Sequence, residues 1–96
     1  MSFPPLAFVD LETTGATATA DRITEIGMVL VDESGVSEWS SLVNPGTPIP
    51  SFITGLTGIS DVMVADAPAF AELAGEVLGR LAVRLFIAHN ARFYTI

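Results

Sequence analysis

Two carboxylate residues near the N-terminus have the type and spacing that metal-dependent phosphate chemistry requires. Asp10 and Glu12 occupy alternate positions of the run Phe8-Val9-Asp10-Leu11-Glu12. A β-strand would send both to one face, with Cα atoms roughly 6.5–7 Å apart. Hard divalent cations prefer oxygen ligands, and two such ions can flank a phosphoryl group. The pair predicts a divalent-cation site beside the turn Thr13-Thr14-Gly15, the alternative being solvated surface carboxylates.

The first half of the chain predicts three strands that would position this pair. Residues 6–12 form the first, and residues 22–31 form a second that is nearly continuous in apolar residues and therefore mostly buried. The turn Asp32-Glu33-Ser34-Gly35 leads into a third strand at 36–43. A connection this short predicts an antiparallel hairpin.

The second half predicts helices and one further strand. Short helical turns are expected at 51–56 and 60–64, and Asp66 is a candidate N-cap for a helix over 67–82. That helix carries an apolar stripe at helical spacing, which indicates core packing. The stripe comprises Phe70, Leu73, Ala74, Val77, Leu78 and Leu81. Residues 84–89 are predicted to be a further buried strand.

This order of elements places the chain in the α/β class, as one domain over residues 1–96. A hairpin followed by a strand–helix–strand unit implies a mixed sheet, with antiparallel hairpin strands, one parallel strand and a helix on one face. The eight residues after Ala88 are too few for a full helix on the other face. We therefore expect the domain to be incomplete at its C-terminus.

Composition excludes several classes of function. The chain has no cysteine, so neither a disulfide framework nor a zinc–thiolate site can form. A net charge of −7, with no lysine, weighs against a passive nucleic-acid binder, although bound cations could still let an enzyme dock phosphate. No basic leader or bilayer-length apolar run is present, which predicts a cytoplasmic protein without a membrane partner.

Three other ionisable residues have two interpretations each. Glu25 is interpreted as a solvated position on a partly exposed strand in preference to a ligand. His89, the only histidine, is interpreted as a structural hydrogen-bonded residue in preference to a ligand or base. Arg92 is either a phosphate contact or a solvated residue, and both interpretations stay open.

Four segments together resemble the DEDD superfamily of 3′→5′ exonucleases. Within it, the DEDDh group is the most similar, represented by the proofreading epsilon subunit of bacterial DNA polymerase III. The segments are Asp10-Leu11-Glu12-Thr13-Thr14-Gly15, Arg22-Ile23-Thr24-Glu25-Ile26-Gly27, Val43-Asn44-Pro45 with Ile53-Thr54-Gly55-Leu56-Thr57, and Ala88-His89-Asn90-Ala91-Arg92-Phe93. The resemblance implies a ribonuclease H-like fold, of which this chain would be the N-terminal portion.

The resemblance also implies a function and a site. The function is 3′→5′ exonuclease activity of the DNA replication and repair type, in which Asp10 and Glu12 hold two Mg²⁺ or Mn²⁺ ions for phosphodiester hydrolysis. The substrate would be a single-stranded or frayed 3′ end of DNA, and a DNA polymerase subunit is an expected partner. The expected nucleotide contacts are Thr13, Thr14, Gly15, Thr54, Leu56 and Asn90.

Two departures from the family pattern predict that this chain is inactive or impaired. Tyr94 stands where the second motif has an aspartate, and a phenol is protonated at neutral pH. The third motif, with its histidine base and last aspartate, is absent from the sequence. The alternatives are a non-catalytic binding module for a polymerase or another protein, and an RNA-directed 3′→5′ exonuclease. Self-association through an uncovered sheet face is also expected.

Overall fold

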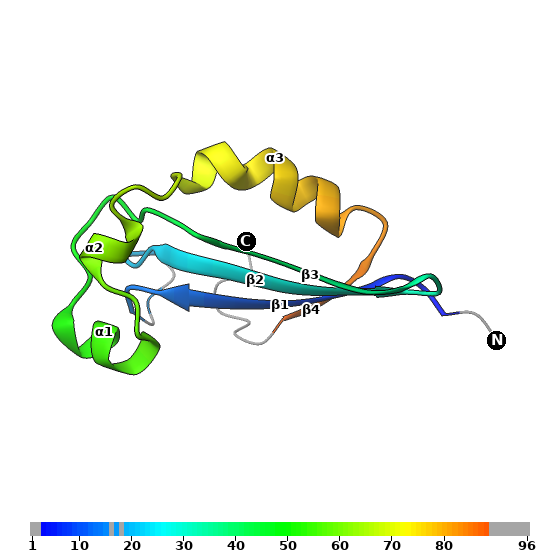
Figure 1. Cartoon of the computed structure of the whole chain (residues 1–96), viewed down its shortest axis with the longest axis horizontal. Coiled ribbons are helices and arrows are strands. Elements are labelled where there is room, and N and C mark those ends of the chain that lie inside the picture. The colour runs from blue at the N-terminus through cyan, green and yellow to red at the C-terminus, as the bar shows by residue number, and fades with distance from the viewer. Residues whose placement is uncertain (1–2, 16, 18, 89–96) are drawn as a thin grey trace.

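The computed structural model describes residues 3–15, 17 and 19–88, which form a sheet with helices at one end and over one face (Figure 1). In chain order the elements are β1 (Leu6–Thr13), β2 (Ile23–Asp32), β3 (Gly35–Leu42), α1 (Ser51–Thr57), α2 (Asp61–Val64), α3 (Phe70–Leu81) and β4 (Leu85–Ala88). The strand order is β3-β2-β1-β4. β4 runs parallel to β1, and the other neighbours are antiparallel. The predicted mixed sheet is confirmed.

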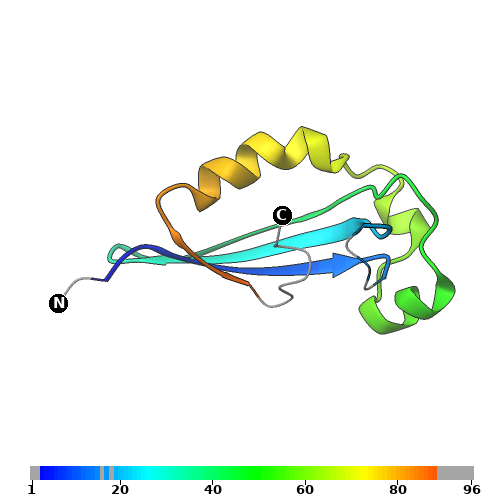
Figure 2. The same cartoon turned by 180° about the vertical axis from the view of Figure 1, so that it is seen from behind.

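The main core lies between the sheet and α3, which covers one face (Figure 2). Its buried members are Ala7, Val9, Ile26, Met28, Leu30 and Val43, with Leu73, Val77 and Leu81 of α3 packed against them. β2 alternates buried and half-buried residues along its length. The prediction that β2 is mostly buried holds at alternate positions only, because α3 covers one face of the strand.

The N-terminus of α3 differs from the prediction. The helix begins at Phe70, and its N-cap is Ala69 in extended conformation, so Asp66 does not cap it. Proline disfavours helical geometry in the preceding residue, which keeps Ala67 out of the helix. The chain instead pairs with the segment that follows β3, since Asn44 N donates to Pro68 O at 2.9 Å.

Two apolar positions of the predicted stripe are also less buried than expected. Phe70 and Leu78 are exposed, although Leu73 and Val77 between them pack against the core. The stripe is therefore narrower than helical spacing alone indicated.

β4 is a strand as predicted, but it is not buried. Leu85, Phe86 and Ile87 are each 43–56% exposed. β4 is the last strand at its side of the sheet among the described residues, and one of its faces lies on the side that α3 does not cover. An apolar sequence predicted burial, but the position of the strand in the sheet decides it.

A second, smaller core holds α1 and α2 beyond the end at which β1 terminates (Figure 1). It consists of Ile49, Ile53, Ile59 and Val64, with Leu42 and Ala67 packed against it. Asp61 adds a polar link, since its Oδ1 accepts a hydrogen bond from Ile49 N at 2.9 Å.

Among the described residues, no helix is long and apolar enough to cross a bilayer.

Candidate active site

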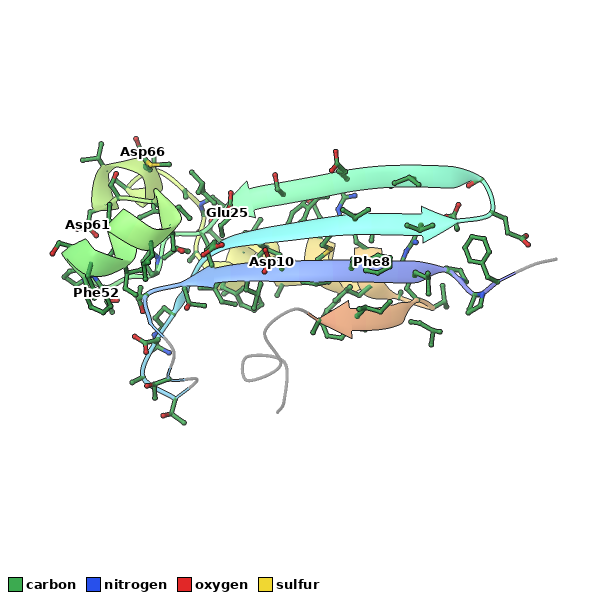
Figure 3. All side chains as sticks on the ribbon, turned by 90° about the horizontal axis from the view of Figure 1, so that it is seen from below. Phe8, Asp10, Glu25, Phe52, Asp61 and Asp66 are labelled. Carbon is green, nitrogen blue, oxygen red and sulfur yellow. The ribbon has the colours of Figure 1, made fainter. Side chains whose placement is uncertain are left out.

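The two candidate metal-binding carboxylates lie on the sheet face opposite the main core. Ala7 and Val9 of β1 point into that core and are buried, so the alternate positions Asp10 and Glu12 share the other face. Asp10 is exposed and Glu12 is half-buried. Figure 3 views this face, with α3 behind the sheet and Asp10 close to the end of β1. Strand alternation thus places the predicted pair together.

The strand beside the pair supplies one open position and one further carboxylate. Asp10 pairs with Gly27, and Glu12 pairs with Glu25. Gly27 has no side chain, and a Cβ built there would come no closer than 3.9 Å to Asp10 O. The space over Gly27 therefore stays open beside the Asp10 carboxylate.

An open hollow of about 660 Å³ crosses this face from β3 to β4 and is lined in part by Asp10. Its lining includes Phe8, Asp10, Gly27, Glu38, Ser40 and Ile87. Phe8 and Ile87 pair across β1 and β4 and are 42% and 43% exposed. The hollow is thus apolar on its β4 side and has carboxylates at Asp10 of β1 and Glu38 of β3.

The sheet changes register where the candidate site begins. Glu12 pairs with Glu25 but the next residue, Thr13, pairs with Ile23, so Thr24 is an extra residue on β2. Bulges of this kind bend a strand and re-aim its side chains, and they are frequent next to active sites. The bulge therefore separates the carboxylate pair from the turn that follows.

The three residues of that turn have different surroundings. Thr14 is buried, and its hydroxyl donates to Asp21 Oδ1 at 3.0 Å. The Thr14 hydroxyl oxygen also accepts a hydrogen bond from Arg22 N at 2.9 Å. Thr13 donates its hydroxyl to the carbonyl of Gly15. These side-chain oxygens are already used inside the loop. Two backbone groups of the turn are used as well, since Thr14 N donates to Arg22 O at 2.8 Å and the carbonyl of Gly15 accepts from Thr13.

The two candidate nucleotide contacts in α1 lie on the helical end of the molecule. Leu56 is 78% exposed, whereas Thr54 is half-buried. Ile53, the residue before Thr54, packs into the smaller core. This contact fixes which side of α1 faces outward. A large apolar side chain is therefore displayed on the part of the molecule beyond the end of β1.

The remaining predicted positions, His89, Asn90, Arg92 and Tyr94, lie outside the described residues. Within the described part of the chain, no group of three or more His, Cys, Asp or Glu side chains could hold a metal ion. Mg²⁺ usually keeps several waters and takes one or two carboxylates together with substrate phosphates. Asp10 and Glu12 fit one ion bound in that way, and a second ion would need additional ligands.

The sequence profile of a family described as Exonuclease (RNase T) matches residues 7–95. The chain belongs to this exonuclease family. The match runs from β1 to beyond β4, so the predicted relationship to exonucleases is confirmed.

Curated relatives of this exonuclease-family chain include two kinds of larger protein. The 3′-5′ exonuclease DinG of Staphylococcus haemolyticus is 40% identical over 94 residues, which are 97% of this chain and 10% of that protein. A PolC-type DNA polymerase III of Caldanaerobacter subterraneus is 44% identical over 85 residues, or 88% of this chain and 6% of the polymerase. The chain thus spans a tenth or less of these relatives.

Solved structures agree with this assignment. Exonuclease X in complex with 5′-overhanging duplex DNA matches with a TM-score of 0.76 and 31% identity, covering 93% of this chain and 51% of that one. A structure of exonuclease I matches with a TM-score of 0.79 at 18% identity, over 93% of this chain and 21% of the other. The second likeness shows the fold, which is the ribonuclease H-like arrangement expected from the sequence.

Asp21 is the residue of this region that sequence reasoning missed. It lies outside the strands and outside the acidic pair, yet its carboxylate contacts the turn at the end of β1. A usable signal was present, since Asp is frequent in loops where it accepts hydrogen bonds from nearby backbone N–H groups.

Proposed function

We propose that this chain is the N-terminal part of a 3′→5′ exonuclease centre that acts on DNA. The observation that carries the proposal is the shared exposed face of Asp10 and Glu12, next to the turn of 13–15, in a member of the exonuclease family. Asp10 and Glu12 would hold Mg²⁺ or Mn²⁺. A bound cation would offset phosphate charge and lower the pKa of bound water, supplying a nucleophile for hydrolysis.

The other proposed contacts are those that the family resemblance implies. The backbone of Thr13, Thr14 and Gly15 would face the terminal nucleotide, and Leu56 would pack on its base or sugar, as apolar and aromatic side chains do with unstacked bases. Thr54 and Asn90 complete the proposed substrate contacts. DNA is favoured over RNA because the exonuclease X relative is complexed with DNA. The PolC-type relative supports a polymerase context.

We further propose that the 96-residue chain by itself is inactive or impaired. One carboxylate pair can hold one hydrated ion, whereas two-ion hydrolysis needs more ligands. Shortening of 5′-labelled single-stranded DNA in the presence of Mn²⁺ should therefore be negligible. Robust turnover that Asp10→Ala abolishes would overturn the claim of inactivity while supporting the exonuclease proposal.

Metal binding tests the site without requiring turnover. Mn²⁺ should broaden the NMR signals of residues around Asp10 and Glu12, and Asp10→Asn should weaken Mn²⁺ binding at least about tenfold, since losing even an outer-shell partner costs 10–100-fold. Asp66→Asn is the matched control, because this exposed carboxylate lies at the helical end, away from Asp10 (Figure 3). Equal loss in both variants would contradict a specific site.

A further inference from the structure

The connection between β1 and β2 is closed by one carboxylate. Asp21 Oδ1 accepts the Thr14 hydroxyl hydrogen at 3.0 Å, and Asp21 Oδ2 accepts from Thr17 N at 2.9 Å. Both oxygens of Asp21 are therefore used within the loop. An ionised carboxylate is an acceptor only, so it suits this pair of donors.

Thr14 and Arg22 fasten the base of the same loop. Thr14 N donates to Arg22 O at 2.8 Å, and Arg22 N donates to the Thr14 hydroxyl oxygen at 2.9 Å. Thr14 is 5% exposed, and its hydroxyl has both a donor and an acceptor partner. Loss of one partner of a buried polar group destabilises the arrangement more than an average exposed contact does.

Gly15 and Asp21 also fit each other sterically. A Cβ built on Gly15 would lie 2.5 Å from Asp21 Oδ2 and 2.7 Å from two other atoms of that carboxyl group. Any side chain at Gly15 would therefore have to displace the carboxylate that holds Thr14. The glycine lets the backbone of the turn rest directly against Asp21.

We infer that Asp21 is a positioning residue that sets the shape of the Thr13–Gly15 turn for the terminal nucleotide. It does not touch the nucleotide or the metal ion, and it acts through Thr14 and the backbone at Gly15. This inference rests on the proposed function, which assigns the terminal nucleotide to that turn. It adds a residue that the carboxylate pair and the family motifs do not include.

Binding of a short oligonucleotide measures this role directly. The probe is a 5′-labelled oligothymidylate with a free 3′-hydroxyl, titrated into the full chain with Ca²⁺ or Mg²⁺, and a 3′-phosphorylated version reports recognition of the end. Asp21→Asn should weaken binding of the free 3′ end about tenfold or more, as expected for lost hydrogen bonds to a charged group. Its Mn²⁺ affinity should stay within about twofold of wild type, because Asp10 and Glu12 are unchanged. Asp66→Asn controls for the lost charge.

Two further comparisons separate positioning from a general loss of folding. Thr14→Ser keeps the hydroxyl and should retain binding, whereas Thr14→Val removes it and should reproduce the Asp21→Asn defect. Gly15→Ala should weaken binding in the wild-type background and have little effect in an Asp21→Ala background, because the clash is then absent. Such coupling is expected only for residues in contact.

The outcomes distinguish this inference from the proposed function. If wild-type chain binds the free 3′ end and Asp21→Asn binds equally well, the positioning role is overturned and the exonuclease assignment stands. If the wild-type chain shows no metal-dependent preference for the free 3′ end, both the positioning role of Asp21 and the proposed exonuclease function are contradicted. If Asp21→Asn does not fold, equal binding by the Thr14→Ser and Thr14→Val variants would still overturn the inference.

Discussion

Two buried threonines at the same end of the sheet differ in their hydrogen bonding. The Thr14 hydroxyl has both a donor and an acceptor partner. Thr24 is 1% exposed, and its Oγ1 has no hydrogen-bond partner among the described residues. Thr24 is the extra residue of the bulge on β2, so the bulge that separates the carboxylates from the turn also buries an unpaired hydroxyl.

Replacing that hydroxyl by a methyl group should stabilise the chain. We expect Thr24→Val to raise the free energy of unfolding by about 1 kcal/mol, since an unsatisfied buried polar group costs 1–3 kcal/mol. Urea denaturation followed by circular dichroism measures the change. Thr14→Val is the matched control and should lower the free energy of unfolding by a similar amount. Destabilisation by Thr24→Val would show that its hydroxyl has a partner.

At the scale of elements, the turn between β2 and β3 links stability to pH. Ser34 donates to Asp32 Oδ1 through its hydroxyl and its backbone N–H, and Arg84 lies 3.5 Å from Asp32 Oδ2. The hydrogen bonds from Ser34, foremost that of its hydroxyl, hold the pKa of Asp32 below its ordinary value of 3.8, and Arg84 adds to this lowering. The ionised form is therefore favoured in the folded chain.

A lowered carboxyl pKa contributes stability above the pKa of the unfolded chain, and this contribution is lost as pH falls through the lower folded value. Asp32 should thus stabilise the hairpin at neutral pH and progressively cease to do so below about pH 4. Urea denaturation from pH 6 to pH 2.5 should show a shallower acid decline for Asp32→Asn than for wild type. Ser34→Ala should show a decline of intermediate depth, because losing the Ser34 hydroxyl brings the folded pKa of Asp32 closer to that of the unfolded chain. Identical acid profiles for all three proteins would contradict this assignment.

The contact between α3 and β3 depends on a cluster around the single tryptophan. Trp39 Nε1 donates to Glu76 Oε1 at 2.7 Å, and the Arg80 guanidinium lies 5.1 Å from the Trp39 ring centroid. Arg80 also pairs with Glu76 at 3.2 Å. The cluster joins two elements that are far apart in the sequence, so it helps to keep α3 on the covered face.

Removing the cation from this cluster should loosen α3 slightly. We expect Arg80→Ala to lower the free energy of unfolding by about 0.5–1 kcal/mol, because an exposed cation–π contact and a surface ion pair are each weak. Trp39 fluorescence should shift to longer wavelength as the ring gains solvent. Glu33→Ala in the β2–β3 turn is the control. Equal effects of the two substitutions would argue against a specific role for the cluster.

For the whole molecule, the decisive feature is that one sheet face is covered by α3 and the other is open among the described residues. Phe8, Leu85 and Ile87 are 42–56% exposed, and the hollow beside them is lined in part by Asp10. Apolar surface of this kind favours contact with another protein surface. The nearby carboxylates oppose such contact by like-charge repulsion, and that repulsion is screened by salt.

We therefore expect the chain to self-associate as concentration and salt increase. Sedimentation velocity over a concentration series should show this, and Ile87→Glu should suppress it by placing a charge in the apolar part of the open face. Val62→Glu, at an 85% exposed position of α2, should leave the association unchanged. A monomer at every concentration and salt level would rule the contact out.

The sequence by itself determined the relation between Asp10 and Glu12. Strand alternation is a local property of the backbone, so residues at i and i+2 share a face wherever the strand lies. The hairpin and the existence of α1, α2 and α3 were predictable for the same reason, since turn residues and periodicity act over a few residues. The family motifs added the expected chemistry.

Only the tertiary structure decided which face is covered and how the turn at the end of β1 is held. Which face of the sheet is covered depends on where α3 packs. That packing uses contacts between residues distant in the sequence, such as Trp39 and Glu76. Asn44 likewise forms a bridge with Ala69, and α3 begins at Phe70, later than Asp66 as an N-cap had predicted. The contact of Asp21 with Thr14 forms only when the loop closes, because it needs both strands in register.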